Sequence, residues 1–187
     1  LVCLENTHNR CNGAVLSQEY INCIANIAHE AGAALHIDSA RLFNASISLG
    51  IPAKELVAPA DSAMFCFSKG LSCPIGSMIC GSSSFIERAR IARNSLGGGM
   101  RQVGVIAAAA IVALDEMVER LAEDHLNARR LAEGLSLSPG IIIDPARVET
   151  NIVIIKLQDG NAQELLNTLA QNGLGASKVD EEHIRMV

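Results

Sequence analysis

The segment FCFSKGLSCPIGS, residues 65–77, puts a lysine directly after an apolar run. Residues 64–67 are apolar and predict the end of a buried strand, whereas Lys69 lies between Ser68 and Gly70 with no carboxylate nearby in the sequence. An ammonium group at the end of a buried strand is unfavourable unless it has an anionic partner or faces a ligand. The small residues on either side of the lysine would leave room for such a ligand.

Asp38 ends a second predicted strand, residues 33–37, and lies 31 positions before Lys69 (69 − 38). In open α/β sheets, ligands bind at the carboxyl ends of the strands. This carboxylate and the amine of Lys69 could therefore face one ligand. A buried ion pair of Asp38 with Lys69, or with the nearby Arg41, would explain the same pattern. The spacing alone leaves both explanations open.

His36 shares a strand face with Asp38, because alternate residues of a strand point the same way, and this would allow a hydrogen bond between them. Neither His36 nor His8 belongs to an HxxxH or HxH pattern, so the sequence predicts no metal site. A GxSxG elbow and a local Cys–His arrangement are also absent from the sequence, which disfavours hydrolytic nucleophiles of those kinds.

Outward from these two strand ends, strands and helices alternate along the chain. Strands are predicted at the start, at 33–37, 63–67, 76–80, 140–143 and 151–157, and at the C-terminal end. Helices are predicted at 18–30 (with Ser17 as N-cap), from a cap at Ser83 or Ser84 to about residue 95, and at 101–121, 123–135 and 161–172, with a helical turn at 51–56. The scarcity of charge before Asp115 predicts that half of helix 101–121 is deeply buried. This order predicts an α/β layered domain followed by the start of a smaller α+β domain.

The composition fits a globular domain and excludes several classes of protein. The chain has 187 residues, of which 49% are hydrophobic and 19% charged, enough to bury a core. Its net charge of −5 is spread without a lysine-rich block, which disfavours nucleic acid and anionic membranes as partners. No apolar run reaches the roughly 18 residues that a membrane span needs. Six cysteines without a CxxC pair predict free thiols in a reducing, cytoplasmic compartment.

Three consecutive glycines, residues 97–99, come just before Arg101 at the predicted start of a helix. Free backbone amides at a helix start, together with a guanidinium group, could hold a phosphate. The glycines follow a helix and lack GxGxxG spacing, so they are not a dinucleotide-binding fingerprint. A flexible connection between two helices explains them more simply.

Four segments together resemble a known family. LENTHN (4–9), HIDSARLFNA (36–45), FCFSKGLSCPIGS (65–77) and LGGGMRQVG (96–104) are similar, in order and separation, to segments of the low-specificity threonine aldolases. Those are pyridoxal-phosphate enzymes of the aspartate-aminotransferase fold, related to the β-eliminating lyases. The resemblance implies a three-layer α/β sandwich with a mainly parallel sheet, as in PLP-dependent transferases of fold type I, followed by part of a small α+β domain.

The resemblance covers nearly the whole chain and implies that it is a fragment, without the N-terminal part and the C-terminal end of the family. Residues 1–122 would be the second half of the large PLP-binding domain. Residues 123–187 would be a linking helix and part of the small C-terminal domain. The family's ring-stacking residue and main phosphate cup belong to the absent half, so the 187 residues alone are expected to be inactive.

By the same resemblance, Lys69 forms the Schiff base with pyridoxal 5'-phosphate. This task needs an amine whose pKa is lowered by apolar surroundings, which residues 64–67 would supply. Asp38 pairs with the protonated pyridine nitrogen and so keeps the ring an electron sink. Ser68 and Arg101 reach the cofactor phosphate, Arg101 from a neighbouring subunit.

The resemblance also implies two substrate-carboxylate ligands, Arg41 and Arg185. Arg185 lies in IRMV, residues 184–187, which is similar to an IRLV-type segment of the family, and a guanidinium can grip a carboxylate with two parallel hydrogen bonds. The chain departs from the family pattern at Ser39, where glycine is usual, at Asn94, where lysine is common, and at Cys11-Asn12-Gly13, where a tighter glycine pair is common.

The function implied is cleavage of L-threonine or L-allo-threonine to glycine and acetaldehyde, a carbon–carbon lyase reaction of threonine catabolism and glycine biosynthesis. The β-hydroxyl base is not identified. The alternatives are β-elimination from another amino acid on the same scaffold and a catalytically silent fragment of that fold. The family resemblance further implies a homodimer or homotetramer with shared active sites, located in the cytoplasm.

Overall fold

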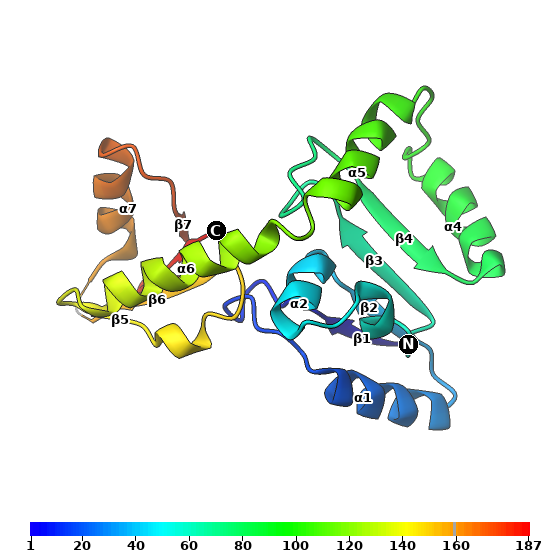
Figure 1. The fold of residues 1–187 in the computed structure, drawn as a ribbon, viewed down its shortest axis with the longest axis horizontal. Helices are drawn as coiled ribbons and strands as arrows, with labels where there is room; N and C mark the ends of the chain where they lie inside the picture. Colours follow the sequence, from blue (N-terminus) through cyan, green and yellow to red (C-terminus); the bar gives the residue numbers. More distant parts are fainter. Residues whose placement is uncertain (159) are drawn as a thin grey trace. The chain divides into compact units, whose positions relative to one another are not determined.

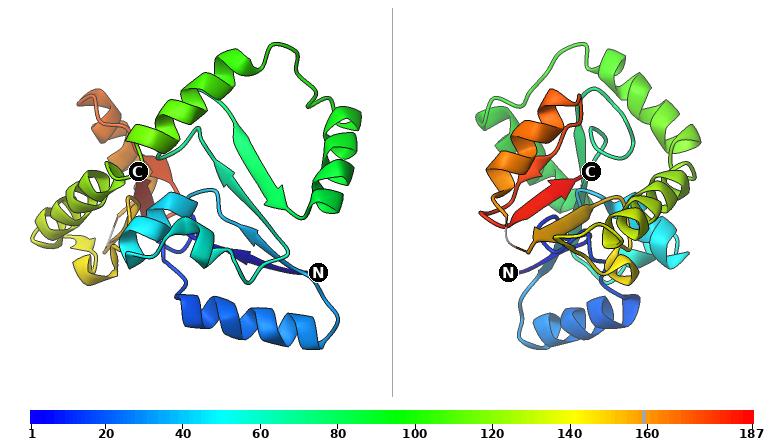
Figure 2. Two further views of the ribbon diagram at one scale, coloured as in Figure 1. Left: turned by 45° about the vertical axis from the view of Figure 1, so that its right-hand side comes forward. Right: turned by 90° about the vertical axis from the view of Figure 1, so that its left-hand side faces the viewer.

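The computed structural model describes residues 1–158 and 160–187 and divides into two compact units. Unit 1 comprises residues 1–7 and 16–121, and unit 2 comprises residues 8–15 and 122–187. Figures 1 and 2 show the ribbon from three directions. Residues 8–15 thus leave unit 1 directly after its first strand and belong to unit 2, an excursion that the sequence did not indicate.

Unit 1 is built on a mainly parallel four-stranded sheet. In sheet order, its strands are β1 (Val2–Glu5), β2 (Leu35–Asp38), β3 (Ser62–Cys66) and β4 (Ser77–Gly81). The first three run parallel, and β4 pairs antiparallel with β3. Glu5, Asp38 and Met64 are neighbours across the three parallel strands, so the carboxyl ends of these strands are aligned. The predicted α/β class with a mainly parallel sheet is confirmed.

One face of this sheet is covered by helix α1 (Gln18–Glu30). The helix begins where the sequence predicted, because the Ser17 hydroxyl accepts a hydrogen bond from the Tyr20 amide at 3.2 Å. Its Ile21 packs with Ile37 and Ala63 of the sheet in one buried cluster. Alternate strand residues, among them Asp38, therefore face the opposite side.

A second apolar cluster anchors the chain that follows β3. Phe67, Leu71 and Cys73 are buried there, together with Ala113 of α5 (Gly104–Glu116). Phe65 joins the cluster through edge-to-face ring contacts, 5.2 Å from Phe43 and 5.1 Å from Phe67 between ring centroids. The apolar residues of the FCFSKGLSC segment therefore immobilise its backbone, which fixes the position of Lys69.

The remaining helices of unit 1 correct two expectations. Helix α2 (Leu42–Leu49) was missed, because its buried face includes the polar residues Asn44 and Ser46 and so breaks the apolar pattern. Of α5, only Ala113 is buried, whereas Val105 is 83% exposed. The expectation of a deeply buried half of this helix is wrong for the described chain. α3 (Ala53–Leu56) and α4 (Ser83–Ser95) complete the unit. The cap of α4 is Ser82, whose hydroxyl accepts from the Phe85 amide at 3.3 Å, and not Ser83 or Ser84 as predicted.

β4 is exposed along its whole length, although its sequence is apolar. Met78 and Ile79 are 45% and 43% exposed. Its pairing with β3 satisfies one edge of the strand, and no described element pairs with the other edge. Apolar strand residues are normally buried by packing, so unit 1 has an uncovered apolar surface beside β4 and α5.

Asp61 links the amino ends of β2 and β3. Its Oδ2 accepts a hydrogen bond from the Leu35 amide at 2.8 Å and contacts His29 Nε2 at 3.0 Å. The Leu35 amide first, and His29 second, hold the pKa of the Asp61 carboxyl below its usual range. Because Asp61 comes just before β3, this link lies at the end of the sheet opposite to Asp38.

Unit 2 is an antiparallel sheet with two packed helices. Its elements are α6 (Leu121–Ser136), β5 (Ile141–Ile142), a 3-10 turn (Pro145–Arg147), β6 (Val153–Leu157), α7 (Ala162–Gln171), β7 (Ser177–Lys178) and β8 (His183–Met186). The sheet order is β5-β6-β8-β7. Alternate residues of β6 and Ile184 of β8 pack with alanines of α6 and α7 in the core. Arg185 and its neighbour Ile154 consequently point to the other face.

The excursion of residues 8–15 is bound to unit 2 by side-chain hydrogen bonds. Asn12 Oδ1 accepts from the Ile154 amide at 2.8 Å, and Thr150 Oγ1 donates to the Gly13 carbonyl at 2.9 Å. Gly13 has φ +67°, and a Cβ there would collide with Thr150 Oγ1 and lie 3.2 Å from Ile152 Cβ. Glycine is therefore required where Cys11-Asn12-Gly13 replaces the usual glycine pair.

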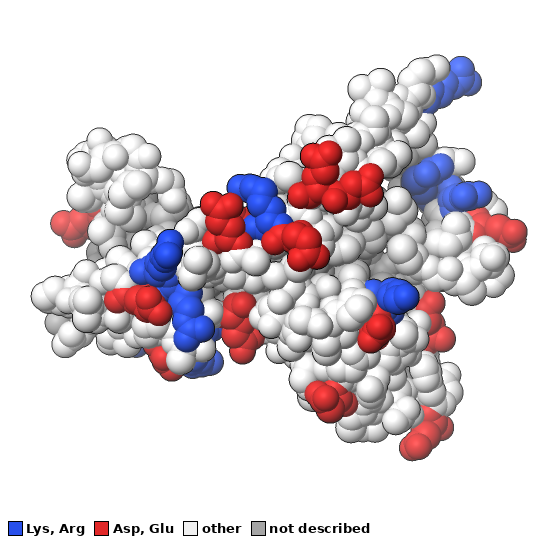
Figure 3. All heavy atoms as spheres, in the orientation of Figure 1, with Lys and Arg blue, Asp and Glu red and all other residues white. Residues whose placement is uncertain are grey.

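The face of the described chain that Figure 3 draws carries no dominant charge. On the face drawn in Figure 3, acidic and basic side chains are interspersed among wide uncharged areas. Among the described helices, none combines the length and the apolar character needed to cross a membrane. Within residues 1–158 and 160–187, no three His, Cys, Asp or Glu side chains are grouped so that they could hold a metal ion.

Candidate active site

The segments that directly follow the three parallel strands of unit 1, called the strand exits below, lie side by side. The Asn6 amide donates to the Asp38 carbonyl at 3.1 Å, and the Ser39 amide donates to the Met64 carbonyl at 3.0 Å. The buried Ser39 hydroxyl also donates to the Asn6 carbonyl. Serine in place of the usual glycine is thus accommodated and links the first two exits. The carboxyl edge of the sheet is continuous, as expected for a ligand site.

Asp38 ends β2 at this edge, and its side chain is exposed. It lies on the same face as Glu5, its neighbour in register on β1. His36, two residues earlier, does not orient it: His36 Nδ1 forms a 2.8 Å hydrogen bond with Ser62 Oγ on β3. The hydrogen bond between His36 and Asp38 that the strand spacing would have allowed is therefore absent from the described contacts.

Lys69 begins a tight turn in the loop after β3. The Ser72 amide donates to the Lys69 carbonyl at 2.9 Å, and the Phe67 amide donates to the Gly76 carbonyl at 2.9 Å, which closes the loop. A Cβ on Gly70 would lie 2.8 Å from Leu121 Cδ2 and 3.0 Å from Asn44 Oδ1, so a larger residue after the lysine would make these side chains shift. The Lys69 side chain is exposed. The described residues thus hold its backbone in place. They do not bury its ammonium group, although the apolar run before it had suggested burial.

Ser68 directly precedes Lys69, and Arg41 follows the end of β2. Ser68 is exposed, and Arg41 is half-buried at the start of α2. The Cys66 amide donates to the Ala40 carbonyl at 3.3 Å, which places the turn before Arg41 next to the exit of β3. The structure therefore brings Asp38, Arg41, Ser68 and Lys69 to one region of unit 1.

Arg101 does not join this group through any contact in the part of the chain that the structure describes. It is exposed in the turn between α4 and α5. A Cβ on Gly99 would lie 2.7 Å from Asn94 Oδ1, and one on Gly98 would lie 2.9 Å from Arg93 Cγ. Side chains at these two positions would crowd the end of α4, which is a structural reason for the glycine run.

Arg185 is half-buried on β8 of unit 2. Its Nη1 donates a 2.8 Å hydrogen bond to Asn9 Oδ1, from the excursion of residues 8–15. Its Nε atom is buried and has no hydrogen-bond partner among the described residues. A guanidinium held at one end with donor groups to spare is suited to bind an anion.

Thr7 is a site residue that the sequence reasoning missed. It is 1% exposed, follows β1 at the carboxyl edge, and its Oγ1 has no hydrogen-bond partner in the described chain. A buried hydroxyl without a partner is unfavourable, which points to a missing ligand or polypeptide group at this edge. Thr7 lies two residues after Glu5, and Glu5 is in register with Asp38. This position was the signal in the sequence that could have identified Thr7 as a site residue. A carboxylate, an amine and a hydroxyl at one edge fit a cofactor with a ring nitrogen, an aldehyde and further polar groups.

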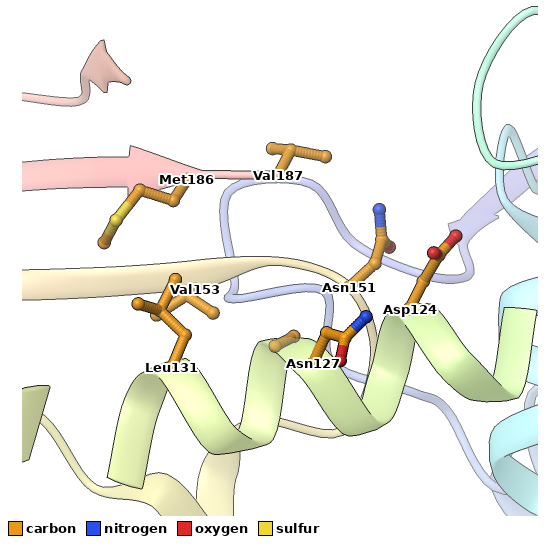
Figure 4. Close-up of a pocket in the computed structure, with 8 residues that line it drawn as sticks. Asp124, Asn127, Leu131, Asn151, Val153, Met186 and Val187 are labelled. Atoms are coloured by element: carbon orange, nitrogen blue, oxygen red, sulfur yellow. The ribbon is translucent and has the colours of Figure 1, made fainter. Parts of the chain in front are cut away.

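A cavity of about 350 Å³ lies elsewhere, in unit 2. Figure 4 shows Asp124 and Asn151 at one end of it and Leu131, Val153 and Met186 at the other. None of the predicted site residues lines this cavity, so it does not mark the candidate active site.

The chain is similar to known proteins in sequence and in fold. The beta-eliminating lyase family model matches residues 1–159. The chain is 50% identical over 190 residues to the low-specificity L-threonine aldolase 1 of Arabidopsis thaliana, which covers 100% of this chain and 53% of the relative. The chain thus spans about half the length of the curated relatives it matches.

Two solved structures share the fold. One is a Listeria monocytogenes protein assigned as an L-allo-threonine aldolase, with a TM-score of 0.85 and 22% identity over 99% of this chain and 54% of that chain. The other is a PLP-dependent aminotransferase from Streptococcus suis, with a TM-score of 0.76 and 19% identity over 98% of this chain and 51% of that chain. They confirm the predicted fold type I. By its sequence match and by its fold, the chain belongs to the beta-eliminating lyase family.

Proposed function

We propose that the complete protein carrying this chain cleaves L-threonine or L-allo-threonine to glycine and acetaldehyde, with pyridoxal phosphate as cofactor. The observation that carries the proposal is the alignment of three strand exits, which brings Asp38, Lys69 and the partnerless hydroxyl of Thr7 to one edge of the sheet. The 50% identity to a plant threonine aldolase supports the choice of substrate.

The roles proposed for the residues follow from their chemistry. Lys69 is the covalent attachment point of the cofactor, and Asp38 holds a proton on the ring nitrogen. When bound, the cofactor supplies an electron sink for the charge left on Cα as the Cα–Cβ bond breaks. Ser68 and Arg101 bind the phosphate, and Arg41 and Arg185 bind the substrate carboxylate.

We also propose that residues 1–122 are the second half of a larger cofactor domain and residues 123–187 a linking helix with part of a smaller domain. The exposed apolar residues of β4 and α5 support this, because further polypeptide would cover them. Assembly as a homodimer or homotetramer in the cytoplasm completes the proposal. The free state of all six cysteines supports a reducing compartment.

The direct test of the function is an assay of the purified complete protein with L-threonine and L-allo-threonine. The proposal expects acetaldehyde and glycine in equal amounts, with no pyruvate or ammonia. Production of pyruvate and ammonia from a substrate with a leaving group on Cβ, without acetaldehyde from threonine, would establish the β-eliminating alternative instead. An absence of visible cofactor absorbance would indicate a silent member of the fold.

Replacing Arg41 with lysine should mainly weaken substrate binding. An ammonium group cannot reproduce the two parallel hydrogen bonds that a guanidinium forms with a carboxylate. We expect the KM for threonine to rise about tenfold or more, equivalent to about 1.4 kcal/mol, while the cofactor absorbance stays intact. An unchanged KM with loss of cofactor would assign Arg41 to the cofactor instead of the substrate.

A further inference from the structure

Ser39 occupies a central position at the carboxyl edge of the unit 1 sheet. It directly follows Asp38, the last residue of β2, and it is fully buried. Its amide donates to the Met64 carbonyl at 3.0 Å, and its hydroxyl donates to the Asn6 carbonyl. One residue therefore binds β3 through its backbone and the exit of β1 through its side chain.

The carbonyl group of Ser39 extends these contacts to the next helix. It accepts a hydrogen bond from the Leu42 amide at 2.8 Å, which forms the turn into α2. The N-cap of α2 is Arg41. A residue of the proposed site thus lies on either side of Ser39 along the chain, Asp38 before it and Arg41 after it. The amide, the carbonyl and the hydroxyl of Ser39 are all hydrogen-bonded.

Only the hydroxyl bond depends on the side chain at position 39. A glycine or an alanine there would keep both backbone bonds and would lose the bond to the Asn6 carbonyl. Asn6 is 1% exposed, and the described residues offer this carbonyl no other hydrogen-bond donor. A buried carbonyl without a partner is unfavourable. Ser39 is not one of the non-glycine residues with a positive φ, so its backbone does not require glycine.

The hydroxyl bond bears on the candidate site because it joins two strand exits that carry site residues. Asp38 ends β2, and Thr7 follows Asn6 after β1. The Asn6 amide donates to the Asp38 carbonyl at 3.1 Å, so the bond from the Ser39 hydroxyl is a second link between the same two segments. Two links restrict the motion of one exit against the other. A ligand bound by groups already held in place loses less conformational freedom on binding.

We propose that Ser39 is a positioning residue: its hydroxyl ties the exit of β1 to the exit of β2 and so holds Asp38 in the orientation that binds the cofactor ring. The inference rests on the proposed function, in which Asp38 holds a proton on the ring nitrogen. It gives a role to the serine that stands in place of the usual glycine, because glycine cannot form this link.

The test compares Ser39→Ala, Ser39→Gly and Ser46→Ala in the complete protein. Ser46→Ala is the matched control, because Ser46 is another buried serine of unit 1 and its hydroxyl also donates to a backbone carbonyl, that of Ile51 at 2.6 Å. The dissociation constant of pyridoxal phosphate is measured by absorbance titration, and the orientation of the bound ring by its circular dichroism. The kcat for threonine, amide hydrogen exchange of the cofactor-free protein and the thermal unfolding midpoint complete the comparison.

Ser39→Ala is the decisive variant, because it removes the hydroxyl and keeps the Cβ. We expect its dissociation constant for pyridoxal phosphate to rise about tenfold, equivalent to about 1.4 kcal/mol. Its kcat should fall about threefold or more, because a less fixed ring is less well oriented for reaction. The circular dichroism of the bound cofactor should weaken. In the cofactor-free protein, the amides of Asn6 and Ser39 should exchange faster than in the wild type.

The other two variants separate positioning from stability. Ser46→Ala should lower the unfolding midpoint as Ser39→Ala does, but it should leave cofactor binding, circular dichroism and kcat unchanged. Ser39→Gly should lower the midpoint further, because glycine adds conformational freedom to the unfolded chain. Its dissociation constant for the cofactor should be at least as high as that of Ser39→Ala.

Two results would overturn the role of Ser39 alone. One is a Ser39→Ala protein that is less stable but binds the cofactor with wild-type affinity and circular dichroism, since the hydroxyl bond would then be purely structural. The other is tighter cofactor binding by Ser39→Gly than by the wild type, since the hydroxyl would then oppose the binding geometry. A wild-type protein that binds no pyridoxal phosphate would instead overturn the proposed function, and with it the role of Ser39 toward the cofactor.

Discussion

Replacing Lys69 with alanine is expected to slow threonine cleavage by the complete protein about 1,000-fold or more, equivalent to a barrier increase of about 4 kcal/mol. The residues on either side of the amine at position 69 are Ser68 and Gly70, and neither carries an amine that could replace it. A covalent attachment point cannot be replaced by a methyl group. Acetaldehyde release, measured with cofactor in excess, gives the rate.

Lys54→Ala is the matched control, because Lys54 is an exposed lysine in the short helix α3. It should retain wild-type turnover. Borohydride reduction of the cofactor-loaded wild type, followed by peptide mapping, should leave the cofactor on Lys69. A label on Lys54, Lys156 or Lys178 instead would show that the attachment point is misplaced.

Asp38→Asn should leave the cofactor attached at Lys69 but slow carbon–carbon cleavage by several orders of magnitude. The amide has nearly the size of the carboxylate, but it carries no charge to stabilise a protonated ring nitrogen, and the electron sink is weakened. The measurement is kcat for threonine, with the cofactor content checked by absorbance. Because Asp38 is exposed at a strand end, the substitution should not disturb the core.

Asp61→Asn provides the comparison for this variant. Asp61 is also next to the sheet, but at the opposite end of the strands, where it binds the Leu35 amide and His29. Its replacement should affect stability and leave kcat near the wild-type value. A kcat for Asp38→Asn within about tenfold of the wild type, a difference of about 1.4 kcal/mol, would be too small for the proposed role.

Local signals in the sequence predicted much of unit 1. Ser17 marked the start of α1 because a serine side chain caps the free amides of a first turn. Asp38 and Lys69 were recognised as strand-end residues because an apolar run stops at each. α2 was missed, since its buried Asn44 and Ser46 do not follow an apolar period. The burial of α5 was overestimated, because composition does not show which neighbours are present to cover a helix.

The sequence by itself determined the family, the α/β class and the residue types available for chemistry, because these depend on local patterns and on motifs of short range. Only the tertiary structure decided which residues meet. Asn9 reaches Arg185 across 176 positions, and the exit of β1 brings the buried hydroxyl of Thr7 to the edge that carries Asp38. Such contacts depend on strand register and on the excursion of residues 8–15. Both are set by hydrogen bonds and packing between distant segments, which no local window of sequence contains.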